Sequence, residues 1–217
     1  MKKYLLTVIL HIMVLALAAQ TDPAAQELLN KVSQKYEAYK TIRSDFTLEV
    51  KDTQGQAFAN SGTMLFNKPQ GQYRIQIKDD DIISDGKAVW NISKELKEVQ
   101  ITEADDNPNT IGPNNLFSFY KNGYKYVHMP DEQIKKNGKT EPVKVVELSP
   151  IDTRTNYFKI KLRVNKNTHI HDITIFDKSN NRYIYTINTL YVNLNLPKSN
   201  FELKKDNYKG YEIIDLR

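Results

Sequence analysis

Cysteine is absent from this 217-residue chain. No disulfide therefore contributes to its stability, and thiolate metal ligands and cysteine nucleophiles are excluded. Glycine occurs only eight times, and Gly55, Gly62 and Gly71 are too scattered to form a phosphate-binding loop. After the first twenty residues, no segment reaches the roughly 20 apolar residues that a membrane-spanning helix needs.

An excess of charge of one sign is also missing. The chain has 31 Lys and Arg against 26 Asp and Glu, for a formal net charge of +5 that falls to +3 without Lys2 and Lys3. Basic and acidic residues are interleaved, as in K-E-L-K-E at residues 94–98. This pattern is typical of a solvated surface, so we expect no nucleic-acid partner.

The N-terminus has the layout of a secretory signal peptide. Lys2 and Lys3 precede an apolar run over residues 4–17, and A-L-A at residues 16–18 matches an A-x-A cleavage site. The run is about fourteen residues long, which is short for a membrane span. We expect residues 1–20 to be removed, with cleavage near residues 18–20, and residues 21–217 to form a single exported, unanchored domain.

The remaining sequence predicts one helix followed by many strands. Asp22 and Pro23 suit a helix N-terminus, and apolar residues at three- and four-residue spacing predict a helix over residues 23–40. From Arg43 onward apolar residues alternate with polar ones in runs about ten residues apart, which indicates an antiparallel meander. We expect a polar loop over residues 131–142 and short strands at residues 201–203 and 211–215.

The break in this alternation at residues 102–113 predicts a loop, followed by a short, aromatic-rich helix over residues 113–120. Two helical pieces cannot cover both faces of a sheet of about eleven strands, whereas a strongly curved sheet needs cover only over its open side. The predicted fold is therefore mainly β (α+β): an incomplete antiparallel β-barrel with an α-helical lid.

No group of residues predicts catalysis or a metal site. His169 and His171 share a strand face, but no further ligand has a recognisable spacing to them. Ser84 opens S-D-G-K, which we interpret as a hairpin turn, and Asp79, Asp80 and Asp81 are expected in a solvated turn. We therefore expect a protein that is not an enzyme and that carries no cofactor.

Aromatic residues are the positive signal, with 13 Tyr and 8 Phe, many of them on strand faces. Taken singly, each suits a packed core. If the fold is a half-open barrel, the same residues taken together favour a concave apolar cavity that binds a hydrophobic ligand. The residues expected to line the cavity and its lid are Phe46, Leu48, Met64, Phe66, Tyr73, Ile75, Ile77, Trp90, Leu116, Phe117, Phe119, Phe158 and Ile160.

Several motifs, in order, resemble the LolA family of periplasmic lipoprotein carriers. I-I-S-D-G-K-A-V-W at residues 82–90 is similar to the family's I-x-S-D-G-K-x-x-W hairpin, and N-K-P-Q-G-Q-Y-R-I at residues 67–75 is similar to its strand that begins with K-P. Residues 39–52, V-V-E-L-S-P at residues 145–150 and F-E-L at residues 201–203 also match. The resemblance covers essentially all of residues 21–217.

The resemblance implies the half-barrel with a helical lid and a cavity for lipoprotein acyl chains. It also implies that a basic residue before the K-P proline latches the lid. Lys68 stands there in place of the usual Arg, and it lacks the planar fork of a guanidinium. Tyr73 and Ile75 fall where the family places large cavity residues, often Trp at the second position.

The partners implied by the resemblance are acylated lipoproteins, an inner-membrane ABC transporter of the LolCDE type and an outer-membrane acceptor, with the carrier a periplasmic monomer. A carrier of another amphiphile, such as a glycolipid, remains the main alternative. The LolB acceptor needs a lipidated cysteine, and the RseB-type regulators carry a further C-terminal domain, so both rank lower. A periplasmic lipid hydrolase would need a nucleophile and base in the cavity.

Overall fold

The N-terminal helix begins where the sequence predicts it. The computed structural model describes residues 22–104, 111, 115–136 and 138–217. Helix α2 (Pro23–Glu37) starts after Asp22, whose side chain accepts hydrogen bonds from the backbone N–H groups of Ala24 and Ala25. The carboxylate thus caps the free donors of the first turn. The predicted signal peptide at residues 1–20 lies outside the described residues.

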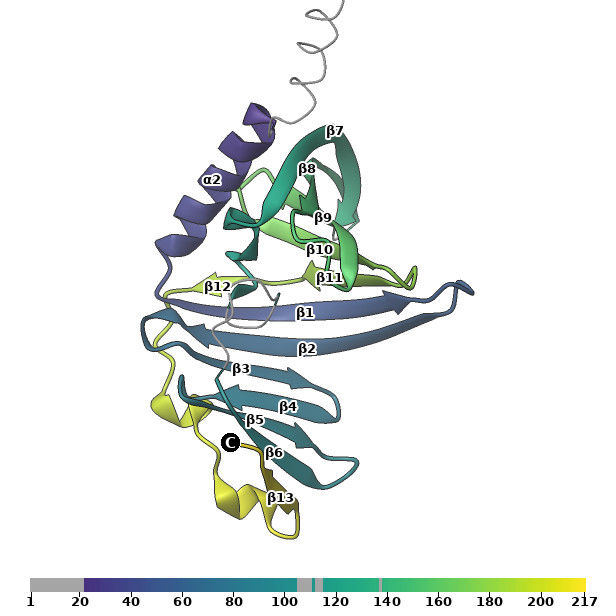
Figure 1. Ribbon diagram of the computed structural model, residues 1–217. Helices are drawn as coiled ribbons and strands as arrows, with labels where there is room; N and C mark the ends of the chain where they lie inside the picture. Colours follow the sequence, from purple (N-terminus) through teal and green to yellow (C-terminus); the bar gives the residue numbers. More distant parts are fainter. Residues whose placement is uncertain (1–21, 105–110, 112–114, 137) are drawn as a thin grey trace, which may run out of the picture.

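The strands form one open, curved sheet (Figure 1). Its order is β13-β6-β5-β4-β3-β2-β1-β11-β10-β9-β8-β7, with the short β12 paired to β1, and all pairs are antiparallel except β13 with β6. The strands are β1 (Thr41–Lys51), β2 (Ala57–Asn67), β3 (Gln72–Ile77), β4 (Asp80–Ser84), β5 (Ala88–Ser93), β6 (Glu98–Glu103), β7 (Tyr124–Lys136), β8 (Lys139–Pro150), β9 (Tyr157–Asn165), β10 (Ile170–Asp177), β11 (Arg182–Ile187), β12 (Tyr191–Val192) and β13 (Glu212–Asp215).

This architecture confirms the predicted class, a mainly β incomplete antiparallel barrel with helical cover. The sheet has 13 strands rather than about eleven. Short 3₁₀ helices occur between the strands: η1 (Lys68–Gln70), η3 (Phe119–Lys121), η4 (Lys198–Phe201) and η5 (Lys205–Tyr208). The predicted turn over residues 85–87 joins β4 to β5, as the S-D-G-K motif suggested.

Three local predictions were wrong. Residues 131–136 and 139–142 are not a loop but the outer part of the β7–β8 hairpin, where buried Ile134 and Val143 prolong the ladder into a polar sequence. The strand predicted at residues 201–203 does not form: Phe201 is the last residue of η4, and residues 202–203 belong to no strand. The described part of the predicted helix over residues 113–120 is a turn that leads into η3.

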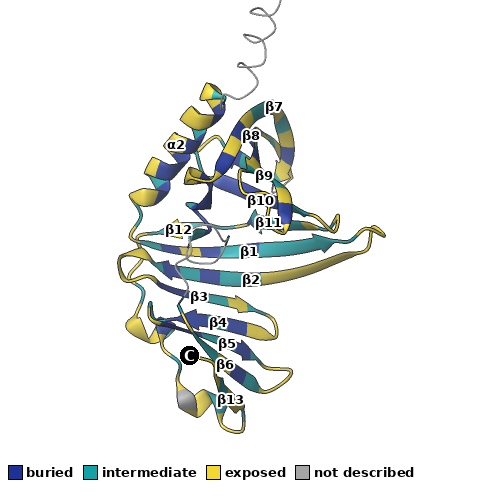
Figure 2. Cartoon of the chain, in the orientation of Figure 1, coloured by how far each residue is buried: buried dark blue, intermediate teal, exposed yellow. Residues whose placement is uncertain are grey.

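The sheet has two unlike faces. Figure 2 shows that the strands on either side of the central β1–β2 pair both contain buried residues. The inner face, which bears Phe46, Met64 and Ile173, packs into the main core together with α2 and residues 115–121. The outer face bears a second cluster of Ile83, Ile92 and Val99, covered by the C-terminal segment. In the described ranges, no helix has the length and hydrophobicity of a membrane span.

Candidate functional site

Helix α2 is attached to the sheet at both of its ends. At its start, the second carboxylate oxygen of Asp22 accepts a hydrogen bond from the backbone N–H of His128 in β7 at 2.9 Å. In its last turn, the hydroxyl of Tyr36 accepts a hydrogen bond from the backbone N–H of Ile170 in β10 at 3.2 Å. These contacts join the helix to the β7–β10 part of the sheet.

Lys68 also holds the C-terminal end of the helix. Its Nζ donates to the carbonyl oxygen of Tyr36 at 2.6 Å and lies 3.5 Å from that of Glu37. These carbonyls belong to the last turn of α2, where oxygens lack N–H donors from a further helical turn and carry partial negative charge. The carbonyl of Tyr36 also accepts a hydrogen bond from the backbone N–H of Tyr39 at 3.2 Å. Burial lowers the pKa of Lys68. Lys68 thus links α2 to η1, between β2 and β3.

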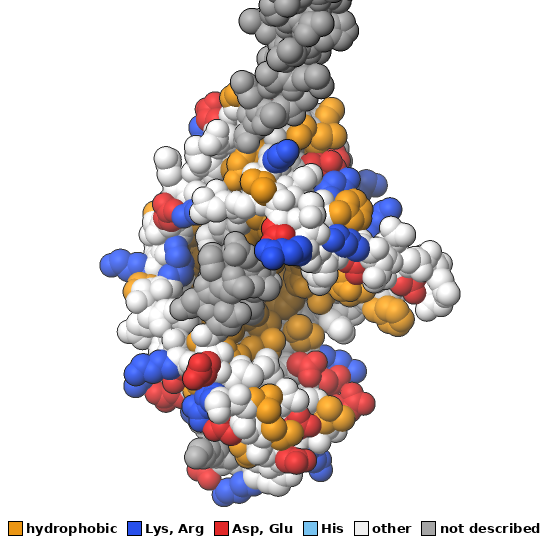
Figure 3. Space-filling model, in the orientation of Figure 1, with side chains coloured by type: hydrophobic (Ala, Val, Ile, Leu, Met, Phe, Trp, Pro, Cys, Tyr) orange, Lys and Arg blue, Asp and Glu red, His pale blue; other side chains and the backbone are white. Residues whose placement is uncertain are grey.

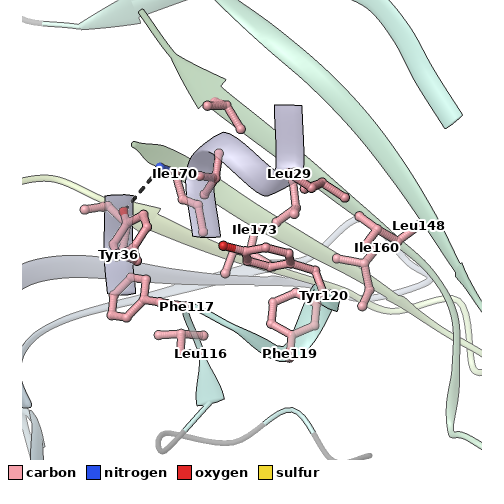
Figure 4. Packing of buried hydrophobic residues seen from close by; sticks show 14 of the residues in the cluster. Leu29, Tyr36, Leu116, Phe117, Phe119, Tyr120, Leu148, Ile160, Ile170 and Ile173 are labelled. Atoms are coloured by element: carbon pink, nitrogen blue, oxygen red, sulfur yellow. Dashed lines mark hydrogen bonds between the residues drawn. The ribbon is translucent and has the colours of Figure 1, made fainter. Parts of the chain in front are cut away.

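Residues 115–121 lie between the helix and the sheet. The ring of Phe117 stacks on Tyr36 with centroids 4.7 Å apart and packs edge-on against Phe66. Figure 4 shows Phe117 beneath Tyr36, with Leu116 next to it. Lys121 forms an ion pair with Glu37 at the end of α2. Together, α2 and residues 115–121 form a two-layered cover, which we call the lid.

A cavity of about 220 Å³ lies between the sheet and this lid. In Figure 3 a hollow lined by hydrophobic side chains opens near the middle of the molecule. Its lining comes from six strands and from the chain segment that follows β6, and every lining residue is hydrophobic: Phe46, Leu48, Met64, Ile75, Ile77, Ile82, Ile111, Leu116, Ile175 and Tyr185.

Most of the predicted site residues gather at this place. Six line the cavity itself: Phe46, Leu48, Met64, Ile75, Ile77 and Leu116. Five more are buried in the main core that surrounds it: Phe66, Tyr73, Phe117, Phe119 and Ile160. The predicted latch, Lys68, contacts the last turn of the helix. The structure thus brings these residues together on the inner face.

Trp90 was assigned to the wrong face. It lies directly opposite Ile83 of β4 and packs against the outer-face cluster of Ile83, Ile92 and Val99, as Leu203, Tyr208 and Tyr211 of the C-terminal segment also do. The alternation of apolar and polar residues correctly groups Trp90 with Ile92, but it does not tell which of the two groups faces the concave side of the sheet. Both faces of β5 are covered, since the C-terminal segment lies over the outer one.

Phe158 was also misplaced, because β9 carries a bulge. Phe176 pairs with Lys159 and Asp177 pairs with Tyr157, which leaves Phe158 without an opposite residue. A bulge shifts the alternation by one residue. Tyr157 therefore turns into the core, where its hydroxyl lies 2.6 Å from that of Tyr124, and Phe158 remains 48% exposed beside Phe176.

Four lining residues were not predicted: Ile82, Ile111, Ile175 and Tyr185. The alternation places Ile175 on one face with Ile173, and Tyr185 on one face with Ile187. The two-residue period could therefore have identified Ile175 and Tyr185 as lining residues. Ile82 adjoins Ile83, and only the pairing of β4 with β3 decides which of them faces inward. Nothing in the sequence pattern marks Ile111.

Two ionisable residues near the lid are partly or fully buried. The Nε2 of His169 lies 2.8 Å from the hydroxyl of Tyr39, and burial lowers the pKa of His169. Burial raises the pKa of Tyr120 to about 12, so its phenol stays neutral. Among the described residues, no group of three or more His, Cys, Asp or Glu could hold a metal ion.

The predicted position of one acidic residue, Asp81, was wrong. Asp81 does not lie in a solvated turn but in β4, where its side chain is 2% exposed and accepts a hydrogen bond from Nε of Arg74 at 3.0 Å. This pair is on the outer face, away from the cavity, as the pairing of Arg74 with Ile83 shows. It satisfies a buried carboxylate, which otherwise costs several kcal/mol.

Comparisons with known proteins agree with this geometry. The model of a family described as outer membrane lipoprotein carrier protein LolA matches residues 37–204. The chain is 23% identical over 207 residues to an outer-membrane lipoprotein carrier protein of Legionella pneumophila (strain Corby), covering 93% of this chain and 96% of that protein.

Solved structures of similar fold include two bacterial proteins. An uncharacterized conserved protein from Thermus thermophilus superposes with a TM-score of 0.57 at 10% identity, covering 88% of this chain and 99% of the other. A LolA superfamily protein from Nitrosomonas europaea gives a TM-score of 0.46 at 15% identity, covering 86% and 100%. The Thermus thermophilus structure supports the open, curved sheet.

Proposed function

The chain belongs to the LolA family of outer membrane lipoprotein carrier proteins, and from this premise we propose that it binds the acyl chains of lipoproteins in the cavity beneath the lid. The lipoproteins would come from the inner membrane and be delivered to the outer membrane. The observation that carries the proposal is the wholly hydrophobic lining of the cavity. Such a lining binds hydrocarbon by removing it from water. Its ionisable group is the phenol of Tyr185, whose pKa is raised by burial.

The size of the cavity implies that the lid moves. About 220 Å³ is less than the roughly 300–1,000 Å³ of pockets that hold drug-sized ligands. Several acyl chains need more room, so we infer that the lid shifts away from the sheet on loading. The contacts that resist this shift are those of Lys68 with α2, of Tyr36 with Ile170 and of Phe117 with Phe66 of β2.

The free energy needed to move the lid lowers the affinity of the cavity for acyl chains, so that bound chains can still be released. Burying one CH₂ group stabilises a bound chain by about 0.8 kcal/mol, so full burial of several chains would bind too tightly for release without an energy source. Breaking the lid contacts offsets part of that gain. We propose that loading occurs from an inner-membrane ABC transporter of the LolCDE type, and unloading to an outer-membrane acceptor.

The test is native mass spectrometry of the protein purified from a periplasmic fraction, with lipid analysis of bound material. Leu48→Asp places a charge in the cavity lining at a partly exposed position. Phe158→Asp is the matched control, since Phe158 lies outside the cavity on an exposed surface. We expect a co-purifying acylated lipoprotein that the first variant loses and the second retains.

Other outcomes separate the alternatives. A bound glycolipid or free lipid without protein cargo would move the function to the carriage of another amphiphile on the same fold. If the protein is empty, it is incubated with lipoprotein-loaded spheroplasts. Release of lipoprotein into solution supports the carrier, and failure to release any would overturn it.

A further inference from the structure

The long hairpin of β1 and β2 extends beyond its neighbour β3 (Figure 1). On the side away from β1, β3 pairs only with residues 62–67 of β2. Among the described residues, no strand pairs with residues 57–61 on that side. All of residues 57–61 are exposed, and Figure 2 shows this half of β2 as an exposed band. We call residues 57–61 the open edge.

The orientation of the backbone groups follows from the hydrogen bonds at the two ends of the hairpin. The N–H of Asp52 donates to the carbonyl of Gln56, and the N–H of Lys68 donates to that of Lys40. Hydrogen-bonded and non-hydrogen-bonded pairs alternate along an antiparallel ladder. Even-numbered residues of β2 therefore bond to β1, while the N–H and C=O groups of residues 57, 59 and 61 point outward.

The open edge lacks the usual protection against pairing. Exposed edges in natural proteins are commonly blocked by lysine, proline, a bulge or a covering loop. Residues 57–61 read A-F-A-N-S, with no charge and no proline, and their pairing with β1 is regular. Such an edge is suited to accept a further strand, and recognition of extended peptides by strand addition is a common mode of binding.

The open edge begins at the rim of the cavity. Asn60 lies opposite Leu48, and Gly62 lies opposite Ile77, and both Leu48 and Ile77 line the cavity. Phe58 shares the inner face with them, because it lies opposite Val50 two residues farther along, and it is 63% exposed. A chain that leaves the cavity beside Ile77 therefore meets the open edge at once.

From this continuity we propose that the open edge binds the polypeptide segment next to the acylated residue of the cargo, in extended conformation, as an added strand. The inference rests on the proposed function. A segment that starts at the cavity and runs outward follows the direction of β3, which makes it antiparallel to β2. Alternate side chains of the segment then lie on the inner face beside Phe58, so apolar residues are favoured there.

The experiment compares three probes for displacement of a fluorescent fatty acid from the protein without its first twenty residues. They are N-palmitoyl-cysteine amide, the same group extended by an uncharged, proline-free hexapeptide, and that peptide with alternate backbone nitrogens methylated. Two methylated peptides are made, one with the odd-numbered and one with the even-numbered backbone nitrogens methylated, because either set could face the open edge. We expect the extended probe to bind about tenfold more tightly than palmitoyl-cysteine amide, and one methylated version to lose that gain, since several backbone hydrogen bonds are involved.

The matched protein variants are Ala59→Pro and Ala59→Val. Proline removes an outward N–H at an exposed position without touching the bonds to β1, whereas valine keeps the donor and suits a strand. The peptide-dependent gain should vanish in Ala59→Pro and persist in Ala59→Val, with palmitoyl-cysteine amide bound equally by both. Should Ala59→Pro fail to fold, the methylated peptides decide the question in the unmodified protein.

The possible failures are distinguishable. If palmitoyl-cysteine amide binds and the peptide adds nothing, the open edge has no such role while the proposed function stands. If neither acylated probe displaces the fatty acid, the proposed function itself fails. If light scattering shows a dimer that Ala59→Pro abolishes, the open edge binds a second copy of the chain, and the inference is overturned.

Discussion

The side-chain nitrogen of Lys68 lies 2.6 Å from the carbonyl oxygen of Tyr36, in the last turn of α2. The resemblance to the family implies an arginine latch at this position, and here the lysine reaches the helix from η1. A lysine donates as a point charge to one carbonyl at short distance, with that of Glu37 at 3.5 Å. An arginine fork could serve both carbonyls at once.

Replacement of Lys68 tests whether this contact restrains the lid. Lys68→Met removes the charged donor from an exposed residue, so we expect a loss of no more than about 1 kcal/mol in the free energy of unfolding. Fatty-acid uptake, followed by stopped-flow fluorescence, should become faster. Lys68→Arg should slow uptake relative to the unmodified protein. Lys87→Met, at an exposed position in the β4–β5 turn, is the control, and equal uptake rates in all four proteins would remove the latch role.

Tyr36 fixes the same turn of the helix to the opposite part of the sheet. Tyr36→Phe keeps the stack on Phe117 but leaves the buried N–H of Ile170 without its acceptor. An unpaired buried donor costs about 1–3 kcal/mol, which urea unfolding would measure. Tyr39→Phe removes a hydroxyl that is partly exposed and should cost less. Equal losses in the two variants would contradict a special role for the Ile170 contact.

The sequence predicts the part of this molecule that depends on local pattern. The cap at Asp22, the helical spacing and the alternation in β1, β2 and β3 are properties of neighbouring residues, and all appear in the structure. For the same reason, the predicted cavity residues on these strands lie together. Pairing between strands adjacent in sequence, joined by short turns such as residues 85–87, preserves that local order.

The errors arise where segments distant in sequence determine which side chains are buried. Trp90 faces outward because the C-terminal segment, more than a hundred residues later, covers that face. The bulge at Phe158 is a property of the pairing with β10, and period two alone does not reveal it. Asp81 lies opposite Ile92 on the outer face that the C-terminal segment covers, and Arg74 of the adjacent strand β3 pairs with it there. Burial by long-range partners leaves no mark in a local pattern of polar and apolar residues.

Gly62 marks a close approach that sets the shape of the cavity. A Cβ added there would lie 2.9 Å from two ring atoms of Phe46 and closer still to the carbonyl oxygen of Gln76. The ring is buried and the carbonyl belongs to the β3 backbone, so neither can give way easily. Gly62→Ala should therefore lower the free energy of unfolding by about 1–3 kcal/mol.

The same substitution should reduce fatty-acid binding, because Phe46 lines the cavity and would be pushed into it. Ser61→Ala, one residue earlier on an exposed part of the strand, provides the control for both measurements. Urea unfolding and fluorescence titration measure the two effects separately. Wild-type stability in Gly62→Ala would show that β3 can move away from β2 at this point.

Acidification should weaken the contact of His169 with Tyr39, just after the C-terminal end of α2. Burial, with a smaller contribution from Lys35, lowers the pKa of His169 below its ordinary value of 6.5. The unfolded chain then binds a proton more readily than the folded one. The stability linked to His169 is fully present above pH 6.5 and is lost as the pH falls through the lowered folded-state pKa. We expect a lower free energy of unfolding at pH 5.5 than at pH 7.5.

His169→Gln isolates this contribution, because glutamine can keep a polar contact with the hydroxyl of Tyr39 but does not titrate. Burial also lowers the pKa of His171, so the variant should retain part of the pH dependence, and His169→Gln combined with His171→Gln should lose more of it. Urea unfolding at several pH values measures the slope in each protein. An unchanged slope in His169→Gln would mean that the imidazole titrates alike in the folded and unfolded chains, and that protonation does not act on the contact between Tyr39 and His169.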